Sequence, residues 1–238
     1  MEEEPSQHRK HFEPAPSTDP PVLYKYYPPK RLDVFDTRIA RFTAPTEFND
    51  AFDSYYDTPA KEYLPHRSRF RRDVGIFCLT EDPNNHLMWV HYAEQHKGFV
   101  LGFATQSTLF ADAGRTLRKV TYEPLPPQIT FEGAPPLTVS CCKSREWIYE
   151  KEWRCVQRFT ATASRDVIFD PMLVIKEVII GSAMTDDHLS QILLFKEMHD
   201  RFESIKLSRS VLNRETWTIG HSPLSMRLCL DCGGTGFK

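Results

Sequence analysis

Short runs of apolar and β-branched residues dominate the pattern along this chain, and long helical patterns are few. The β-prone runs cover residues 22–27, 39–43, 75–80, 99–103, 119–122, 152–159 and 173–180. Each is bounded by Pro, Gly or polar residues, which is typical of strands. The runs 152–159 and 173–180 are predicted to be central strands. Residues 205–212 and 215–219 predict a closing hairpin, because only a short polar segment separates them.

Helical patterns are found in three places. Residues 31–38 predict a short helix, and residues 86–95 predict a mostly buried helix that ends at Lys97 and Gly98. A third helix is expected after Thr185, which caps a first turn carrying Asp186 and Asp187. Residues 57–73 are polar and contain prolines, so we predict a long connection there rather than an element.

Many strands and few helices in an irregular order predict the α+β class, with one or two split, mainly antiparallel sheets. A doubly wound α/β fold is not favoured, because no glycine-rich phosphate loop follows any strand. Residues 1–21 are rich in proline and predict a flexible N-terminal arm. Residues 22–220 predict a single domain, and residues 221–238 a short tail.

Composition narrows the classes of function. The chain has 238 residues, and its 30 Lys and Arg against 32 Asp and Glu give a net charge of −2. A net charge near zero does not support a nucleic-acid coat or a polybasic membrane binder. No apolar run approaches the roughly 18 residues needed to cross a bilayer, and the start of the chain lacks the pattern of a secretory signal. We therefore expect a cytoplasmic protein with reduced cysteines and no membrane partner.

The segment EWIYEKEWR, residues 146–154, is the strongest local signal for chemistry. Glu150 and Glu152 are two residues apart at the mouth of a predicted strand, so both face one side while Trp153 faces the other. Two carboxylates held close together repel each other, which raises the pKa of one and allows an acid and a base role. The alternative is a solvated strand edge on which these glutamates pair with Lys151 or Arg154.

Two further groups have both a functional and a structural interpretation. Trp89 and Tyr92 lie three residues apart on a predicted helix, so they either stack on a planar ligand or belong to the core. Asn49 and Asp50 lie in a polar turn between two phenylalanines, where they either contact a cofactor or satisfy nearby backbone groups. The four arginines between residues 67 and 72 either hold a polyanion or are solvated.

No metal centre is predicted. His86, His91 and His96 are spaced by five residues, which spreads them around a helix axis rather than along one face. Cys229 and Cys232 belong to a CxxCxGxG motif that resembles one zinc-binding repeat of DnaJ-type chaperones. Tetrahedral zinc needs four ligands, so this motif supplies half a site at most. Either another subunit or His221 with a remote cysteine would have to complete it.

Four segments in order resemble a widespread bacterial family, the domain of unknown function 2971. They are YKY at 24–26, FNDAFD at 48–53, LMWVHYA at 87–93 followed by Lys97-Gly98, and WIYEKEWR at 147–154. The resemblance extends over about residues 23–185. The family name implies no activity.

A second resemblance, to toxin-type ADP-ribosyltransferases, implies a fold and a function. That class folds as a split β-sandwich of two mainly antiparallel sheets around an NAD cleft. The resemblance implies a first motif at Lys25 or Tyr26, a second at Thr80 with Trp89 and Tyr92, and a third at Glu152 or Glu150. This sequence departs from the class in having Lys25 where His or Arg is usual.

The resemblance implies an enzyme that transfers ADP-ribose from NAD to a protein or nucleic acid, or hydrolyses NAD. Glu152 would stabilise the positive charge that develops on the ribose, and Glu150 would accept a proton from the incoming nucleophile. Tyr92 or Trp89 would hold the nicotinamide ring, and Lys25 or Arg154 would face the pyrophosphate.

By analogy with that class, the protein would be a toxin or an anti-phage effector, with an antitoxin or immunity protein as a further partner. The alternative is a non-catalytic module that binds nucleic acid through residues 67–72 and the cysteine tail.

Overall fold

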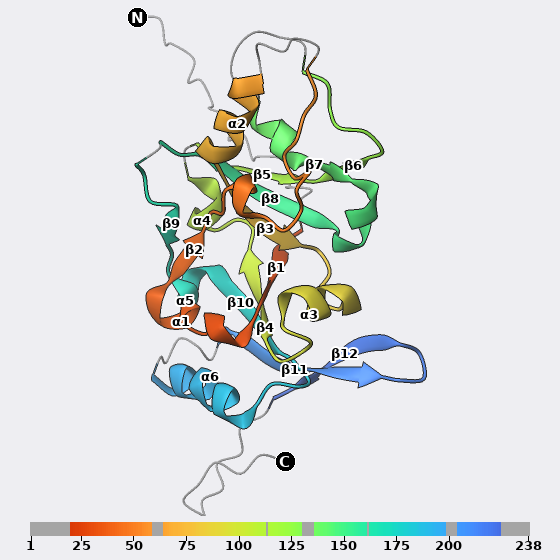
Figure 1. The fold of residues 1–238 in the computed structure, drawn as a ribbon. Coiled ribbons are helices and arrows are strands. Elements are labelled where there is room, and N and C mark those ends of the chain that lie inside the picture. The colour runs from red at the N-terminus through yellow and green to blue at the C-terminus, as the bar shows by residue number, and fades with distance from the viewer. Residues whose placement is uncertain are drawn as a thin grey trace, which may run out of the picture.

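The fold is built around one large sheet that contains eight strands in the order β12-β11-β10-β4-β1-β3-β8-β5 (Figure 1). The computed structural model describes residues 20–58, 64–112, 114–129, 136–160, 162–198 and 204–224. All neighbouring strands are antiparallel except β10 and β11. The strands are β1 (Val22–Tyr27), β3 (Val74–Thr80), β4 (Phe99–Ala104), β5 (Thr116–Lys119), β8 (Glu152–Arg158), β10 (Ile175–Ile180), β11 (Lys206–Asn213) and β12 (Thr218–Pro223).

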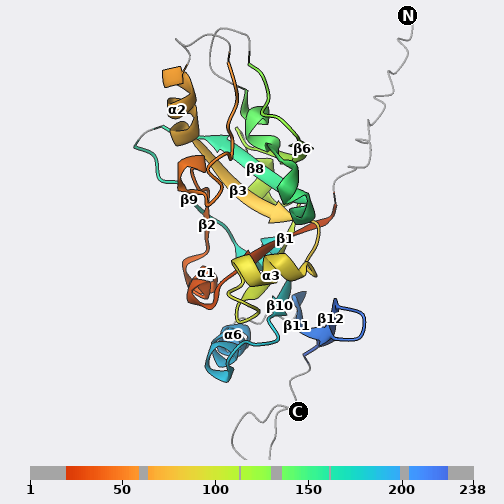
Figure 2. The same ribbon diagram turned by 45° about the vertical axis from the view of Figure 1, so that its right-hand side comes forward.

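In the described residues, two small sheets and six α-helices surround the large sheet. One small sheet pairs β2 (Ile39–Arg41) with β9 (Asp166–Ile168), and the other pairs β6 (Thr121–Glu123) with β7 (Cys142–Ser144). The helices are α1 (Val34–Thr37), α2 (Leu64–Asp73), α3 (His86–Tyr92), α4 (Thr108–Ala111), α5 (Pro171–Val174) and α6 (Asp186–Met198). None of the described helices is long and apolar enough to cross a membrane. The β11–β12 hairpin projects beyond the rest of the described fold (Figure 2).

Alternation along the strands sends apolar side chains to both faces of the large sheet. On β1, Leu23 and Tyr27 belong to the main core cluster, which also contains Leu189 and Ile192 of α6. Tyr26, which precedes Tyr27 and faces the other way, belongs to a second cluster on the opposite face with Trp89 of α3. Helices α6 and α3 therefore cover opposite faces of this part of the sheet, and both faces are buried.

The sheet nearly divides between β1 and β3. Strand β1 pairs with β4 over six residues, but its pairing with β3 is limited to Tyr24 opposite Thr80. Beyond that point the Lys25 ammonium donates a hydrogen bond to the Cys78 carbonyl at 3.0 Å. A side chain of β1 thus reaches a β3 backbone group, so the two halves stay connected while their strands diverge.

The α+β class and the mainly antiparallel sheet are confirmed, but the expectation of two separate sheets needs correction. The single pair between β1 and β3 joins both sets of strands into one sheet, so the split occurs within it. The predicted connection over 57–73 is also wrong in its second half, where α2 forms. Arginine is a good helix former, and Phe70 of α2 is buried in a cluster with Tyr56 and Val74.

Element ends differ from the prediction by a few residues. The strand expected from residue 173 begins at Ile175, because Asp170 caps the short helix α5 before it. The hairpin extends through Pro223, so His221 lies within β12 rather than in a tail. At the other end of the domain, Thr105 bonds to the backbone carbonyls of Pro20 and Pro21, so the end of the predicted arm contacts the sheet. Residues 1–19 and 225–238 lie outside the described part of the chain.

We predict that Gly181→Ala destabilises the fold by about 1–3 kcal/mol, because a Cβ at this position would lie 2.0 Å from the His96 carbonyl oxygen. Gly220→Ala is the matched control, since a Cβ at Gly220 meets nothing within 4 Å. Urea unfolding followed by circular dichroism measures both. Equal stability of the two variants would contradict the close backbone contact between the α3–β4 turn and the end of β10.

Candidate functional site

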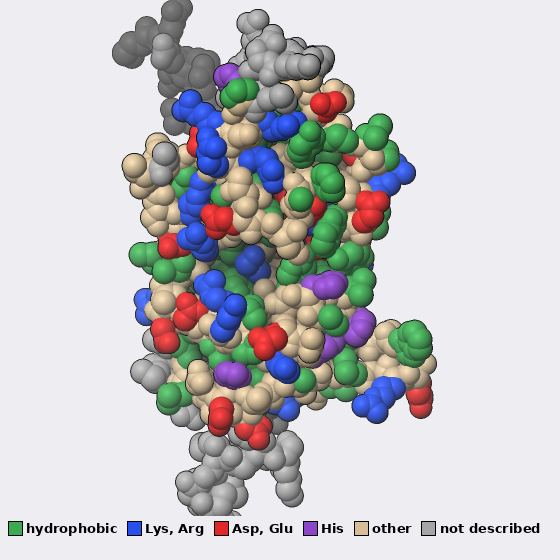
Figure 3. Space-filling view, in the orientation of Figure 1, with side chains coloured by type: hydrophobic (Ala, Val, Ile, Leu, Met, Phe, Trp, Pro, Cys, Tyr) green, Lys and Arg blue, Asp and Glu red, His purple; other side chains and the backbone are tan. Residues whose placement is uncertain are grey.

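A cavity of about 170 Å³ lies where β1 and β3 diverge. Figure 3 shows a hollow near the middle of this face, with Lys or Arg side chains in it. The cavity is lined by residues of β1, β3, β8, α3, the loop before Tyr56, and the segment around β7: Tyr24, Lys25, Tyr26, Phe48, Asn49, Asp53, Cys78, Leu79, Met88, Tyr92, Lys143, Glu150, Glu152 and Arg154. Such a volume is close to the roughly 150 Å³ of a cavity that holds one benzene ring.

Alternation along β8 sends its charged residues to the cavity side of the sheet. Trp153 and Cys155 belong to the main core on one face, whereas Glu152 and Arg154 line the cavity on the other. Arg154 lies directly opposite Cys78 in the β3–β8 register. The expectation that Glu152 and Trp153 point to opposite sides is therefore confirmed.

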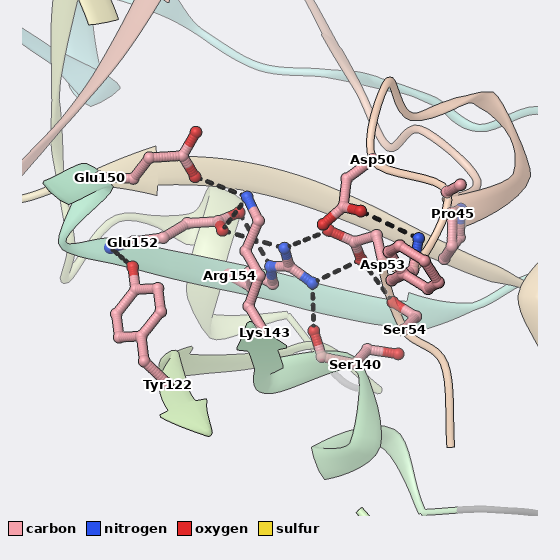
Figure 4. A network of polar contacts seen from close by, with 12 residues as sticks. Pro45, Asp50, Asp53, Ser54, Tyr122, Ser140, Lys143, Glu150, Glu152 and Arg154 are labelled. Carbon is pink, nitrogen blue, oxygen red and sulfur yellow. Dashed lines mark hydrogen bonds and ion pairs between the residues drawn. The ribbon is translucent and has the colours of Figure 1, made fainter. Parts of the chain in front are cut away.

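Arg154 is fully buried and each of its five N–H groups has an acceptor (Figure 4). Its guanidinium donates two bonds to the Asp53 carboxylate at 2.8 and 2.6 Å and two to Glu152 at 2.8 and 2.9 Å. The fifth goes to the backbone carbonyl of Ser140 at 2.6 Å. Two bidentate carboxylates and one carbonyl use all the donors that arginine has. Arg154 therefore joins the Asp53 loop, β8 and the segment before β7.

Lys143 and Tyr92 fix the second glutamate. The Lys143 ammonium lies 2.6 Å from Glu150 Oε2 and 3.2 Å from Glu152 Oε2. The Tyr92 hydroxyl donates to Glu150 Oε1 at 2.6 Å, so each Glu150 oxygen has a donor. Glu150 ends a 3-10 helix and Lys151 has a left-handed backbone with φ of 45°, which lets Glu150 and Glu152 converge on Lys143.

The two glutamates have opposite electrostatic environments. Burial raises the pKa of Glu150 above its usual value, and Lys143 only partly offsets this effect. Burial also opposes ionisation of Glu152, but Arg154 and Lys143 outweigh it and lower the pKa of Glu152 to about 2. Glu152 is thus a fixed anion, whereas Glu150 is the carboxylate that can take up a proton.

The β1 side of the cavity is aromatic. Tyr26 donates to the Asp82 carbonyl at 2.8 Å and packs edge-on against Trp89. The Tyr24 hydroxyl donates to Glu177 at 3.1 Å, and burial raises the pKa of Tyr24 to about 12. Lys25 lies over the Phe77 ring, 4.7 Å from its centroid, and burial lowers the pKa of Lys25.

Arginines of α2 hold the loop that forms the opposite wall. Arg71 donates to the backbone carbonyls of Pro45 and Ala51, and Arg67 donates to the carbonyl of Tyr56. The contacts to Pro45 and Tyr56 flank the stretch that carries Asn49 and Asp53, and the contact to Ala51 lies within it. Two of the arginines that a polyanion would need are thus partly engaged in supporting the site.

Seven of the ten candidate residues line one cavity: Lys25, Tyr26, Asn49, Tyr92, Glu150, Glu152 and Arg154. The other three have structural contacts outside its lining. The Thr80 hydroxyl donates to the Glu150 carbonyl at 2.6 Å, and Trp89 is a fully buried core residue that donates to the Pro83 carbonyl. Asp50 accepts a hydrogen bond from the Phe52 backbone, as in an ordinary turn.

Sequence reasoning missed Lys143, Asp53 and Tyr24. Lys143 belongs to a three-residue strand in a proline-rich region, so no periodicity pointed to it. Asp53 was visible in the FNDAFD segment, but its partner Arg154 is 101 residues away. Tyr24 lies in the YKY segment, whose strand pattern does not indicate that its hydroxyl reaches Glu177, 153 residues away.

The described residues contain no group of three or more His, Cys, Asp or Glu side chains that could hold a metal ion. Cys229 and Cys232 lie outside those residues. Cys78 lines the cavity, but burial raises the pKa of its thiol, which disfavours a thiolate nucleophile.

Comparison with protein families identifies the central part of the chain. Residues 88–155 match a family model described as Protein of unknown function (DUF2971). The match confirms the resemblance to DUF2971 over this stretch, which runs from α3 to β8 and includes Tyr92, Lys143, Glu150, Glu152 and Arg154. No curated protein and no solved structure matches the chain. The DUF2971 description names no activity.

We predict that Arg154→Met destabilises the fold by about 3–5 kcal/mol, because it leaves the Asp53 and Glu152 carboxylates buried without their main cation. The control is Arg118→Met, since Arg118 lies opposite Arg154 on β5 but is exposed. Chemical denaturation measures both variants. A loss below about 1 kcal/mol for Arg154→Met would contradict the central role of this guanidinium.

The depressed pKa of Glu152 predicts a specific acid sensitivity. Its pKa falls from 4.5 to about 2 on folding, so the ionised Glu152 adds about 3 kcal/mol to the free energy of unfolding. This contribution is present above pH 5 and is lost as the pH falls towards 2. The difference in unfolding free energy between the wild type and Glu152→Gln should shrink by about this amount between pH 6 and pH 2. The exposed substitution Glu123→Gln should leave the pH dependence of the wild type unchanged.

Proposed function

We propose that the protein cleaves the bond between nicotinamide and ribose in NAD, as an ADP-ribosyltransferase or an NAD glycohydrolase. The observation that supports this most directly is the Glu150 carboxylate, buried between the Tyr92 hydroxyl and the Lys143 ammonium in a ring-sized aromatic cavity. The resemblance to toxin-type ADP-ribosyltransferases, which have a split sheet around an NAD cleft, supports the same reaction.

The size and lining of the cavity favour one planar ring. Tyr24, Tyr26 and Tyr92 supply aromatic surface and Met88 supplies a polarisable thioether. A volume of about 170 Å³ is well below the roughly 300–1,000 Å³ of pockets that enclose a drug-sized ligand. The nicotinamide would therefore occupy the cavity while the rest of the dinucleotide lies across its mouth.

The chemistry needs an anionic site beside the ribose. As the bond from ribose C1′ to the nicotinamide nitrogen breaks, its electron pair leaves with the ring, which becomes neutral, and the positive charge moves to the ribose. A nucleophile then forms a new bond to C1′ and releases a proton. A fixed carboxylate stabilises the charge that develops on the sugar more than it stabilises the ground state.

The structure favours a division of roles between the two glutamates. Glu152 has both oxygens bound to Arg154, so it supplies negative charge and holds the site in place. Glu150 reaches the cavity with a raised pKa, so it contacts the ribose and accepts the proton of the nucleophile. Arg154 has no free N–H group and Lys143 is bound to both glutamates, so Lys25, the third cation that lines the cavity, would face the pyrophosphate. Trp89 would support Tyr26 from behind rather than touch the ring.

The competing proposal is a nucleic-acid-binding module without turnover. It rests on the arginines of α2, over which Lys and Arg side chains gather in Figure 3. Arg67 and Arg71 bond to backbone carbonyls and Arg69 pairs with Asp73, so these side chains already have internal partners. We therefore favour the enzyme.

We predict that the purified protein releases nicotinamide from NAD, measured by chromatography, and that Glu150→Gln lowers the rate by about 100-fold or more. Tyr92→Phe should lower it by about tenfold, because it removes one donor to Glu150. The matched control is Glu146→Gln, an exposed glutamate of the same segment. Salt-sensitive binding to RNA or DNA without any nicotinamide release would support the competing proposal instead.

A further inference from the structure

The connection from β3 to α3 holds the backbone on both sides of Glu150. The carbonyls of three consecutive residues, 149 to 151, each accept a hydrogen bond from this connection. The bonds run from the Asn85 side-chain amide to Tyr149 at 2.7 Å, from the Thr80 hydroxyl to Glu150 at 2.6 Å, and from the Glu81 backbone N–H to Lys151 at 3.2 Å. We call these three bonds the carbonyl clamp.

Two of the three bonds in the clamp depend on the identity of a side chain. Thr80 is fully buried, so its hydroxyl needs a partner, and the Glu150 carbonyl supplies it. Asn85 caps α3 by accepting from the Met88 backbone N–H, a role that serine or aspartate fills equally well. The N–H donor that reaches Tyr149 is what asparagine adds to the cap. Asn85 therefore does more than begin the helix.

The clamp also fixes α3 relative to the Glu150 carboxylate. Asn85 begins this helix and Tyr92 ends it, where the Tyr92 hydroxyl donates to Glu150 Oε1 at 2.6 Å. The helix thus contacts the segment at two points, the backbone at Tyr149 and the carboxylate of Glu150. Lys151 has a left-handed backbone, which a residue other than glycine keeps only where its surroundings impose it. The bond to the Lys151 carbonyl helps to impose it.

We infer that Thr80 and Asn85 are positioning residues that hold the Glu150 carboxylate between the Tyr92 hydroxyl and the Lys143 ammonium. Neither Thr80 nor Asn85 belongs to the lining of the cavity, so both act through the Glu150 segment. Their effect on the reaction rate rests on the proposed function, whereas their effect on the carboxylate does not. Displacing a reacting group lowers kcat, and KM stays the same if the cavity wall that binds the ligand is unchanged.

The first test measures nicotinamide release from NAD. Thr80→Val removes the hydroxyl at nearly constant shape and should lower kcat about tenfold, with KM changed by less than about twofold. Thr80→Ser should restore the rate, because serine keeps the donor. The matched control is Thr105→Val, which removes another buried hydroxyl that donates to a backbone carbonyl, that of Pro20 at 2.6 Å.

A second variant removes the other side-chain bond of the clamp. Asn85→Ser keeps a capping hydroxyl and adds no charge, but it has no amide donor for the Tyr149 carbonyl. It should lower kcat about as much as Thr80→Val. Asn85→Ser also decides the question if Thr80→Val does not fold, which circular dichroism reveals.

The second test follows the Glu150 carboxyl itself and needs no enzyme activity. Carboxyl carbon NMR gives its pKa in a pH titration, with the signal assigned by its absence in Glu150→Gln. Burial raises this pKa in the wild type. In Thr80→Val and Asn85→Ser the carboxyl becomes more solvated, so its pKa should fall towards the usual value. A purely structural role for Thr80 and Asn85 would lower stability and leave this pKa unchanged.

The outcomes separate positioning from the proposed function. A lower kcat and a lower pKa of Glu150 in both clamp variants, with neither change in Thr105→Val, support the inference. An unchanged pKa of Glu150, an equal loss of rate in Thr105→Val, or a rise in KM at constant kcat overturns it. Absence of nicotinamide release from the wild type would contradict the proposed function, and the titration of Glu150 would then decide on the clamp alone.

Discussion

The buried guanidinium of Arg154 is the interaction on which the site depends. It binds the carboxylates of Asp53 and Glu152 and the carbonyl of Ser140, which belong to the Asp53 loop, to β8 itself and to the segment before β7, and no N–H group is left over. A charge so deeply buried is tolerated only when it is paired and fully hydrogen-bonded. The same pairing lowers the pKa of Glu152, which stays ionised. Glu150, held by Lys143 and Tyr92, has a raised pKa and is the carboxylate that can take up a proton. Glu152 thus anchors the site, whereas Glu150, two residues earlier, is the one able to exchange a proton.

The sequence allowed prediction of those features that depend on local pattern. Alternation predicts the strand that begins at Glu152 and the opposite orientations of Glu152 and Trp153. Helical spacing predicts the helix that carries Tyr92. Asp53 could not be predicted in this way, because its partner Arg154 is 101 residues away. Lys143 is close in sequence to its partners Glu150 and Glu152, but it lies in a three-residue strand that is too short to show a periodic pattern. Helix α2 was missed because its arginines look like a solvated run, whereas Arg67 and Arg71 bond to a neighbouring loop.

Thr80 and Trp89 show how a structural role can resemble a functional one. Both were expected to contact a cofactor, and neither lines the cavity. Thr80 connects the end of β3 to the Glu150 backbone, and Trp89 fills the space behind Tyr26. Thr80 and Trp89 therefore do not contact the cavity themselves, but each holds in place a residue that lines it, Glu150 or Tyr26.

The divergence of β1 from β3 has a consequence for how this domain can be stabilised. The opening exists because only one residue pair links the two strands and the Lys25 side chain reaches Cys78 in place of a further backbone bond. Completing the ladder would add backbone hydrogen bonds and close the space that the tyrosines enclose. A continuous ladder between β1 and β3 and an open cavity therefore exclude each other at this position, so substitutions that stabilise the sheet by completing this ladder would fill the cavity.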